Sequence, residues 1–248
     1  MPKLYFDVDQ GSAEWYKLRS KIATSSEFHN ILTPAKMQLS TARFKYQARI
    51  VAARLLNWQA DSLEKIDHIA DGKAFEPLAV GQMELISGIQ TRKLGFATTN
   101  DGRFGASPDR VQMSGEAVGV TAEVKCPTIP IQMERLLFGH GSDYAVQVAG
   151  QLWVCEADKA IFFSFNPRMP PYMVETGRDE VMIGKLAAAL EQFSDELEAL
   201  TEKAKALGMF QAFAEVLPPA DTELAPLDHT AEDFVDQFVE TRAARGMA

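Results

Sequence analysis

Apolar residues recur every three to four positions in the first third of the chain, a spacing typical of amphipathic helices. Ser12 has the position of an N-terminal cap for a short helix that contains Trp15. The run Thr24-Ser25-Ser26-Glu27 has the spacing of a capping box and predicts the start of a second helix. A third helix is expected over residues 41–58.

A fourth helix is predicted to begin after Asp71, which can cap it. Its expected buried face consists of the apolar residues Phe75, Leu78, Met83 and Ile86. Proline lacks a backbone donor and disturbs a helix interior, so Pro77 predicts a kink or a late start.

The spacing changes between residues 89 and 126, where frequent glycines separate short β-prone segments. This stretch predicts three strands, the third running from Val118 to Cys126 and closed by Pro127. Beyond it the pattern predicts helices over 131–138 and 144–155, a strand over 160–165 and a long helix over 178–207. This order predicts an α/β fold with a mixed central β-sheet flanked by helices.

The C-terminal part differs in composition from the rest of the chain. We expect one domain over residues 1–210, a proline-rich linker over 211–228 and an acidic helix over 229–248. The last helix carries an apolar stripe but is too short to be stable alone, so it is expected to dock on another surface.

Composition narrows the class of protein. Hydrophobic residues make up 46% and charged residues 24%, which is typical of a soluble globular protein. There is no apolar run of about 18 residues and no signal peptide, so no membrane partner is expected. Cys126 and Cys155 form neither a disulfide framework nor a metal-ligand cluster, and a reducing cytoplasm is the natural compartment.

The net charge of −9 is unevenly distributed along the chain. Residues 191–248 hold 13 acidic and 4 basic residues and account for the whole excess. Residues 1–60 hold 9 basic and 4 acidic residues, so they could contact phosphate groups at one surface. Charge therefore permits nucleic-acid binding without demonstrating it.

Two short segments combine residues suited to phosphodiester hydrolysis. Ser107-Pro108-Asp109 is followed, fourteen residues after the aspartate, by Glu123-Val124-Lys125. Side chains alternate along a strand, so Glu123 and Lys125 share one face while Val124 points into the core. A hairpin could bring Asp109 beside Glu123, and such a pair of carboxylates favours a hard cation such as Mg²⁺, with Mn²⁺ as a substitute.

Lys125 could orient or deprotonate an attacking water, or stabilise charge on the scissile phosphate. Purely structural roles are also common for residues in such patterns. A Glu-x-Lys sequence on a strand often forms a solvated face, and an aspartate after proline often forms a turn. The pair alone leaves both interpretations open.

Segments along most of the chain resemble the phage lambda exonuclease family, restriction-endonuclease-like nucleases with a Pro-Asp…Glu-x-Lys signature. The order and approximate spacing of the matching segments hold from about residue 11 to 205. The segments are Trp15 to Arg19, Ile22 to Glu27, Gly72 to Glu76, Ala106 to Asp109, Glu123 to Pro127, Tyr144 to Val148, Gln151 to Val154, and Phe165 to Met169. Residues 33–66 and 128–142 match poorly, and residues from about 210 to 248 have no counterpart.

The resemblance implies a restriction-endonuclease-like fold and a role for each matched residue. Asp109, Glu123 and the backbone carbonyl of Val124 would ligate Mg²⁺, and Lys125 would be the catalytic lysine. Glu76 would be a second-metal ligand or a base, although a surface glutamate is the simpler interpretation.

The same resemblance implies contacts with the end of a DNA duplex. Arg19, Ser26, Ser107 and Gln147 match a pocket for the 5′-terminal phosphate, a role that suits a guanidinium fork with neutral donors. Ile69 occupies the place of an apolar wedge that helps separate the terminal base pairs, although an isolated isoleucine is more often core.

The implied function is processive 5′-to-3′ digestion of one strand of linear double-stranded DNA by a homotrimeric ring in the bacterial host cytoplasm. The remaining 3′ strand would serve a single-strand annealing protein. Two alternatives stay open: an endonuclease or nicking enzyme of the same fold, and a non-catalytic DNA-binding or recruitment protein.

Overall fold

The computed structural model describes residues 1–56 and 67–207, and the side chains within them except those of residues 67–73 and 143. The predicted linker over 211–228 and the helix over 229–248 lie outside the described residues, as does the predicted domain boundary at 210.

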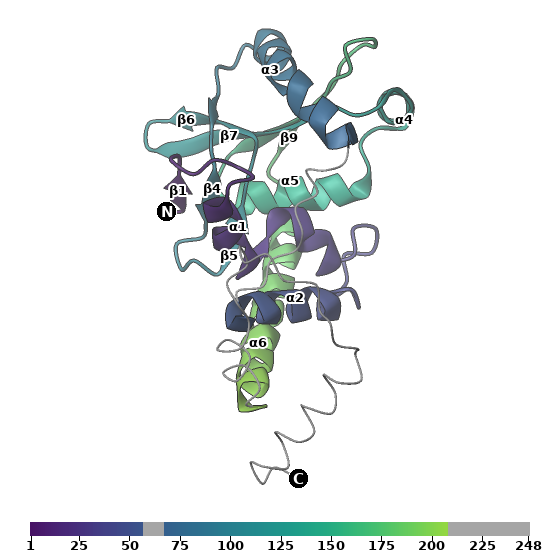
Figure 1. The fold of residues 1–248 in the computed structure, drawn as a ribbon. Coiled ribbons are helices and arrows are strands. Elements are labelled where there is room, and N and C mark those ends of the chain that lie inside the picture. The colour runs from purple at the N-terminus through teal and green to yellow at the C-terminus, as the bar shows by residue number, and fades with distance from the viewer. Residues whose placement is uncertain (57–66, 208–248) are drawn as a thin grey trace, which may run out of the picture. The chain divides into compact units, whose positions relative to one another are not determined.

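The described part of the chain contains both helices and strands (Figure 1). The N-terminal elements are β1 (Lys3–Tyr5), α1 (Ala13–Ser20), β2 (Ala23–Thr24), the 3-10 helix η1 (Ser25–Asn30), α2 (Arg43–Leu56) and α3 (Asp67–Ser87). Five strands follow: β3 (Arg92–Lys93), β4 (Phe96–Thr98), β5 (Phe104–Ala106), β6 (Arg110–Ser114) and β7 (Ala117–Lys125). The last elements are α4 (Ile129–Phe138), α5 (Ser142–Val154), β8 (Lys159–Ser164), β9 (Tyr172–Gly177) and α6 (Glu180–Ala206).

The strands form two mixed sheets. The larger has the order β3-β6-β7-β8-β9, in which β7 and β8 are parallel and the other pairs are antiparallel. The smaller has the order β1-β4-β5-β2, with a parallel pair between β2 and β5. The predicted fold class, a mixed α/β arrangement flanked by helices, is confirmed.

Helices α3 and α5 lie on opposite faces of the larger sheet, with strand β7 between them (Figure 1). Val120, Val124 and Phe163 pack against Met83 of α3 in one buried cluster. The expectation that Val124 points into the core is therefore confirmed. Glu123 and Lys125 alternate with these residues, so they point to the opposite face, toward α5.

Helices α2 and α6 support the segment that carries Ser26. The ring of Tyr46 on α2 packs 5.5 Å from that of Phe193 on α6. Its hydroxyl accepts a hydrogen bond of 2.9 Å from the backbone N–H of Thr24, at the junction of β2 and η1. Burial raises the pKa of Tyr46 to about 12, so the hydroxyl stays neutral and keeps its proton.

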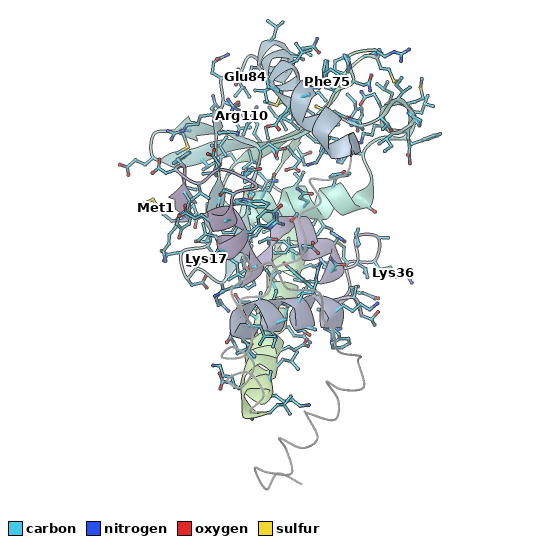
Figure 2. All side chains as sticks on the ribbon, viewed as in Figure 1. Met1, Lys17, Lys36, Phe75, Glu84 and Arg110 are labelled. Atoms are coloured by element: carbon cyan, nitrogen blue, oxygen red, sulfur yellow. The ribbon has the colours of Figure 1, made fainter. Side chains whose placement is uncertain are left out.

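The predicted buried face of α3 is wrong in three of its four positions. Met83 is fully buried, but Phe75, Leu78 and Ile86 are 39%, 54% and 51% exposed, and Figure 2 labels Phe75 on the helix. The helix packs instead along Ala79 and Met83, because a small alanine lets it approach the sheet closely. It also begins at Asp67, well before Pro77, so the late start is wrong.

The sequence pattern did not predict several strands and helix boundaries. Residues 89–126 form five strands rather than three, and strands β1 and β9 were not predicted. Strands of two or three residues are too short to show alternation. The cap at Ser12 is confirmed, since its side chain accepts from the Trp15 N–H, whereas residues 25–30 form a 3-10 helix without a capping side-chain bond.

Helix α6 neutralises part of the basic N-terminal region. Arg43 and Arg54 on α2 pair with Glu196 and Glu198 at 3.1 and 2.7 Å. These arginines are thus partly engaged within the protein. Although α6 spans 27 residues, none of the helices in the described part of the chain is both long and apolar enough to cross a membrane.

Candidate active site

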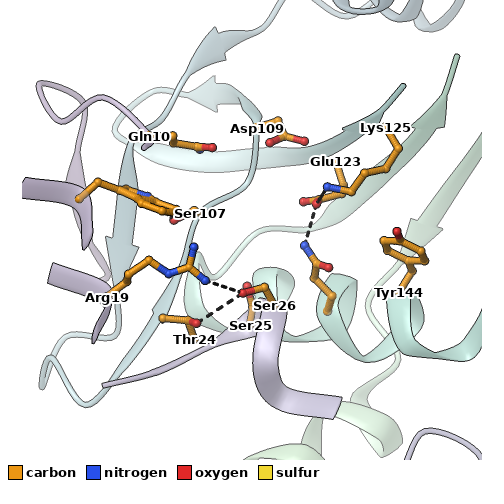
Figure 3. Close-up of a pocket in the computed structure, with 12 residues that line it drawn as sticks. Gln10, Arg19, Thr24, Ser25, Ser26, Ser107, Asp109, Glu123, Lys125 and Tyr144 are labelled. Carbon is orange, nitrogen blue, oxygen red and sulfur yellow. Dashed lines mark hydrogen bonds and ion pairs between the residues drawn. The ribbon is translucent and has the colours of Figure 1, made fainter. Parts of the chain in front are cut away.

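A cavity of about 280 Å³ gathers most of the predicted site residues (Figure 3). Its lining consists of Gln10, Trp15, Arg19, Thr24, Ser25, Ser26, Ser107, Asp109, Glu123, Lys125, Tyr144 and Gln147. Asp109, Glu123 and Lys125 lie on one side, and Arg19 with Ser26 lies on the other (Figure 3). Of the predicted residues whose side chains the structure describes, Glu76 and Val124 are outside this lining.

The β6–β7 hairpin brings the two acidic residues together. Arg110 pairs with Ala122 across the antiparallel strands, so Asp109, one residue earlier, lies next to Glu123. The backbone N–H of Val124 donates a 2.7 Å hydrogen bond to Oδ2 of Asp109. The hairpin predicted from the spacing of the two segments is thus present, and the Val124 backbone takes part through its N–H group. Its carbonyl as a metal ligand stays a prediction.

Glu123 is held from both sides. Its side chain is only 3% exposed. Oε1 accepts a 2.7 Å hydrogen bond from Gln147 Nε2 and forms an ion pair with Lys125 Nζ. Oε2 accepts a 2.5 Å hydrogen bond from Gln151 Nε2. Both glutamines come from α5, one helical turn apart, so a single rigid helix orients the carboxylate.

The carboxylates carry more negative charge than Lys125 balances. Burial, and then the charge of Glu123, raises the pKa of Asp109 to about 7. Burial alone would lower the pKa of Lys125, but the charges of Glu123 and Asp109 outweigh it and raise that pKa above its ordinary value. With both carboxylates charged and close, Lys125 is held as a cation that can donate a proton or balance charge.

The donor set fits a hard divalent cation. Asp109 and Glu123 supply carboxylate oxygens at one cavity wall, and a further positive charge would relieve the repulsion that raises the pKa of Asp109. Within the described residues, however, no group of three or more His, Cys, Asp or Glu side chains is placed to hold an ion. Glu76 on α3 contributes through charge, since it also raises the pKa of Asp109.

The opposite wall presents a cation among neutral donors. Arg19 Nη2 donates a 2.9 Å hydrogen bond to Ser26 Oγ, and the guanidinium lies 4.1 Å over the ring of Trp15. Trp15 Nε1 in turn donates to Ser107 Oγ at 2.9 Å. Burial lowers the pKa of Arg19, though not enough to discharge a guanidinium. A half-buried cation whose close contacts are neutral suits an anionic ligand.

Two predicted contacts differ from expectation or fall outside the description. Gln147 lines the cavity as expected, but its amide donates to Glu123 rather than facing the Arg19 wall. Ile69 lies near the start of α3, and its side chain is outside the described set, so the wedge stays a prediction.

Sequence reasoning missed six residues at the site. Five line the cavity and one lies behind it: Gln10, Trp15, Thr24, Ser25, Tyr144 and Gln151. Gln10 donates to the carbonyls of Leu94 and Pro108 at 2.9 and 3.1 Å and so fixes the turn before Asp109. All of them except Gln10 lie in the segments that resemble the lambda exonuclease family, and Gln151 also lies four residues after Gln147 on the same helix face.

Two exonucleases are among the proteins whose solved structures resemble this fold. The alkaline exonuclease LHK-Exo from Laribacter hongkongensis superposes with a TM-score of 0.67 and 24% identity, covering 83% of this chain and 100% of that one. LHK-Exo in complex with dAMP gives the same values. A phage-related exonuclease from Haemophilus somnus 129PT has a TM-score of 0.54 and 15% identity, covering 74% and 98%. At these identities the matches establish the fold, which is of the restriction-endonuclease-like type.

No curated protein shows significant sequence similarity to the chain. The profile of the YqaJ-like viral recombinase domain matches residues 14–158, more than half of the chain. That stretch includes both walls of the cavity, from Trp15 to Gln147. It confirms the resemblance to the lambda exonuclease family and supports a nuclease role in recombination. The chain therefore belongs to the YqaJ-like viral recombinase family.

Proposed function

We propose that this protein is a Mg²⁺-dependent exonuclease that digests the 5′-ended strand of linear duplex DNA and leaves a 3′ single strand. One observation carries the proposal: a single cavity is lined by Asp109, Glu123 and Lys125 on one wall and by Arg19 with neutral donors on the other. An enzyme that cuts inside a strand has no need of a pocket for a terminal phosphate. LHK-Exo has been crystallised with dAMP, which belongs to the product class of such a reaction.

Binding of the DNA end is assigned to the Arg19 wall. The guanidinium would receive the 5′-terminal phosphate as a forked donor. Ser107 Oγ accepts from Trp15, which leaves its own proton available to the phosphate. Ser26 Oγ likewise accepts from Arg19 and retains a proton to donate. The terminal phosphate would thus fix how far the strand enters.

Hydrolysis is assigned to the opposite wall. Asp109 and Glu123 would hold the metal, which when bound polarises the scissile phosphate and lowers the pKa of a bound water. Lys125 would exchange its contact with Glu123 for the phosphate and balance the charge that develops there. Gln147 would turn from Glu123 toward the DNA, consistent with its half-buried position on the cavity wall.

The remaining parts of the proposal concern assembly and partners. A homotrimeric ring around the duplex would account for processive digestion and would allow an acidic protein to enclose DNA through locally basic surfaces. Ile69 would act as the wedge at the terminal base pairs. The 3′ strand would pass to a single-strand annealing protein in the cytoplasm of the bacterial host.

The direct test combines strand labels with topology. Purified protein and Mg²⁺ would be incubated with linear duplex labelled at either end and with covalently closed circular duplex. We expect progressive loss of the 5′-ended strand while circles remain intact. Cutting of the circles would favour an endonuclease of the same fold. Retention of DNA without cleavage in Mg²⁺ or Mn²⁺ would favour a binding or recruitment protein.

A further inference from the structure

Gln151 on α5 has an unusual environment for a buried glutamine. It is fully buried, and its Nε2 donates a 2.5 Å hydrogen bond to Oε2 of Glu123. Its own Oε1 is buried and has no hydrogen-bond partner among the described residues. Burying an unpaired carbonyl oxygen is unfavourable, so packing alone does not explain an amide at this position. A methionine would fill nearly the same volume without that cost.

Gln147 and Gln151 bind different oxygens of the same carboxylate. Gln147 donates to Oε1, which also pairs with Lys125, and it lines the cavity. Gln151 donates to Oε2 and lies behind Glu123, outside the cavity lining. Gln147 and Lys125 can therefore turn toward a substrate, whereas Gln151 is enclosed by the core and keeps its contact.

We propose that Gln151 is a positioning residue that fixes Oε2 of Glu123, so that Oε1 keeps facing the cavity when Gln147 and Lys125 engage DNA. This inference rests on the proposed function. Without Gln151, Glu123 would depend on the two side chains that the substrate draws away. The carboxylate would then lose its orientation during the reaction, while the folded protein and its DNA pocket would remain.

The chain supplies a matched control in Gln47 on α2. Gln47 is also fully buried, donates from Nε2 to a glutamate, Glu196, at 2.9 Å, and has an Oε1 without a partner in the described part of the chain. Glu196 lies outside the cavity and pairs with Arg43. Gln47→Met removes the same kind of contact from a glutamate with no proposed part in the reaction.

The experiment compares full-length wild type, Gln151→Met and Gln47→Met. Four quantities are measured: thermal unfolding, DNA binding in Ca²⁺, Mn²⁺ binding by calorimetry, and kcat and KM on linear duplex in Mg²⁺. We expect Gln151→Met to lower kcat by about 10- to 100-fold and Mn²⁺ affinity by about 10-fold, the usual effect of removing a hydrogen bond to a metal ligand. KM and DNA affinity should stay near wild type, and Gln47→Met should keep wild-type kcat.

A Gln151→Met enzyme with the kcat and Mn²⁺ affinity of Gln47→Met would overturn the proposal. So would a loss of kcat that disappears when rates are scaled to the folded fraction measured by circular dichroism. Failure of the wild type to degrade linear DNA would instead count against the proposed function. In that case the Mn²⁺ titration still decides whether Gln151 orients Glu123.

Discussion

At the scale of single residues, the site is defined by unequal charge on its two walls. Among the described residues, Lys125 is the cation paired with Glu123, and the pKa of Asp109 rises to about 7 through burial and the charge of Glu123. Arg19, by contrast, is a half-buried cation in contact with a hydroxyl and an indole, both neutral. The acidic wall therefore lacks positive charge, which a metal ion would supply. The Arg19 wall lacks negative charge, which a phosphate would supply.

Lys125→Ala is expected to abolish cleavage while leaving DNA binding largely intact, because the lysine balances charge at the scissile phosphate rather than holding the duplex. We expect a loss of kcat of at least about 100-fold. Single-turnover digestion and fluorescence anisotropy would measure the two effects. Lys159→Ala, which removes an exposed lysine paired with Glu175, serves as control. Wild-type turnover by Lys125→Ala would remove this lysine from the mechanism.

Arg19→Ala should erase any preference for a 5′-phosphorylated end, because the guanidinium is the charged group of the proposed pocket. Digestion rates on phosphorylated and hydroxyl ends would be compared for each variant. Lys17→Ala alters an exposed residue on the same helix and should retain the preference. An unchanged preference in Arg19→Ala would place the end-binding pocket elsewhere.

The raised pKa of Asp109 makes a prediction for stability in the absence of metal. The folded pKa of about 7 exceeds the ordinary value of 3.8, so folding is penalised as pH rises between these values and the penalty is complete above the folded pKa. Asp109→Asn should therefore be more stable than wild type at pH 8 in a chelator, by about 1–3 kcal/mol allowing for partial solvent exposure. At about pH 4 the advantage should vanish.

Urea unfolding at both pH values would measure this difference, and added Mg²⁺ should stabilise the wild type more than Asp109→Asn. Equal stability of the two proteins at pH 8 without metal would show that burial and the charge of Glu123 do not raise the pKa of Asp109.

At the scale of elements, the sequence predicted those whose periodicity extends over several turns or pleats. The alternation in Glu123-Val124-Lys125 placed β7 and the orientation of its side chains, and α6 agrees with the predicted 178–207 within a few residues. The strands of two or three residues and the packed face of α3 were not predictable, because they depend on which surface each segment meets. Gln147 illustrates the same limit at the site: its helix was predicted, but its contact with Glu123 requires the sheet beside it.

The packing of α5 against η1 depends on Gly150. A Cβ at this position would lie 2.6 Å from the Phe28 ring and 3.1 Å from Ser25 Cβ. Gly150→Ala should therefore destabilise the protein by about 1–3 kcal/mol through overpacking, although alanine is the better helix former. It should also weaken end binding, because η1 carries Ser26.

The matched control is Gly184→Ala in α6, where an added Cβ meets nothing within 4 Å. This change should stabilise the protein by up to about 1 kcal/mol. Chemical denaturation of both variants would measure the two changes in the free energy of unfolding. A neutral or stabilising Gly150→Ala would mean that η1 moves away from α5 without cost.

At the scale of the whole molecule, the sequence predicted the family and fold but not how its charges are used. The net charge of −9 conceals pairing between acidic α6 and basic α2, where Arg43 and Arg54 meet Glu196 and Glu198. Arg43 and Arg54 therefore stabilise the fold through these ion pairs and are not fully available to bind DNA. An isolated chain would enclose no duplex, so the proposed processivity requires assembly of several copies.

Light scattering should accordingly give a mass three times that of the 27.4 kDa chain. Challenge with excess unlabelled duplex during digestion should leave already engaged enzyme unaffected, because a closed ring does not dissociate from its strand. A monomeric mass together with immediate inhibition by the competitor would contradict the ring.

Helix α5 limits how the site could change during evolution. It orients Glu123 through Gln147 and Gln151, and through Gly150 it sets the closeness of the segment that holds Ser26. If the proposed function holds, packing in the hydrophobic core, rather than a surface loop, sets the distance between the end-binding wall and the cleavage wall. Substitutions on the surface could then change DNA affinity or reaction rate. A change in the distance between the two walls would require the interior to be repacked, so the size of the product should stay constant during evolution.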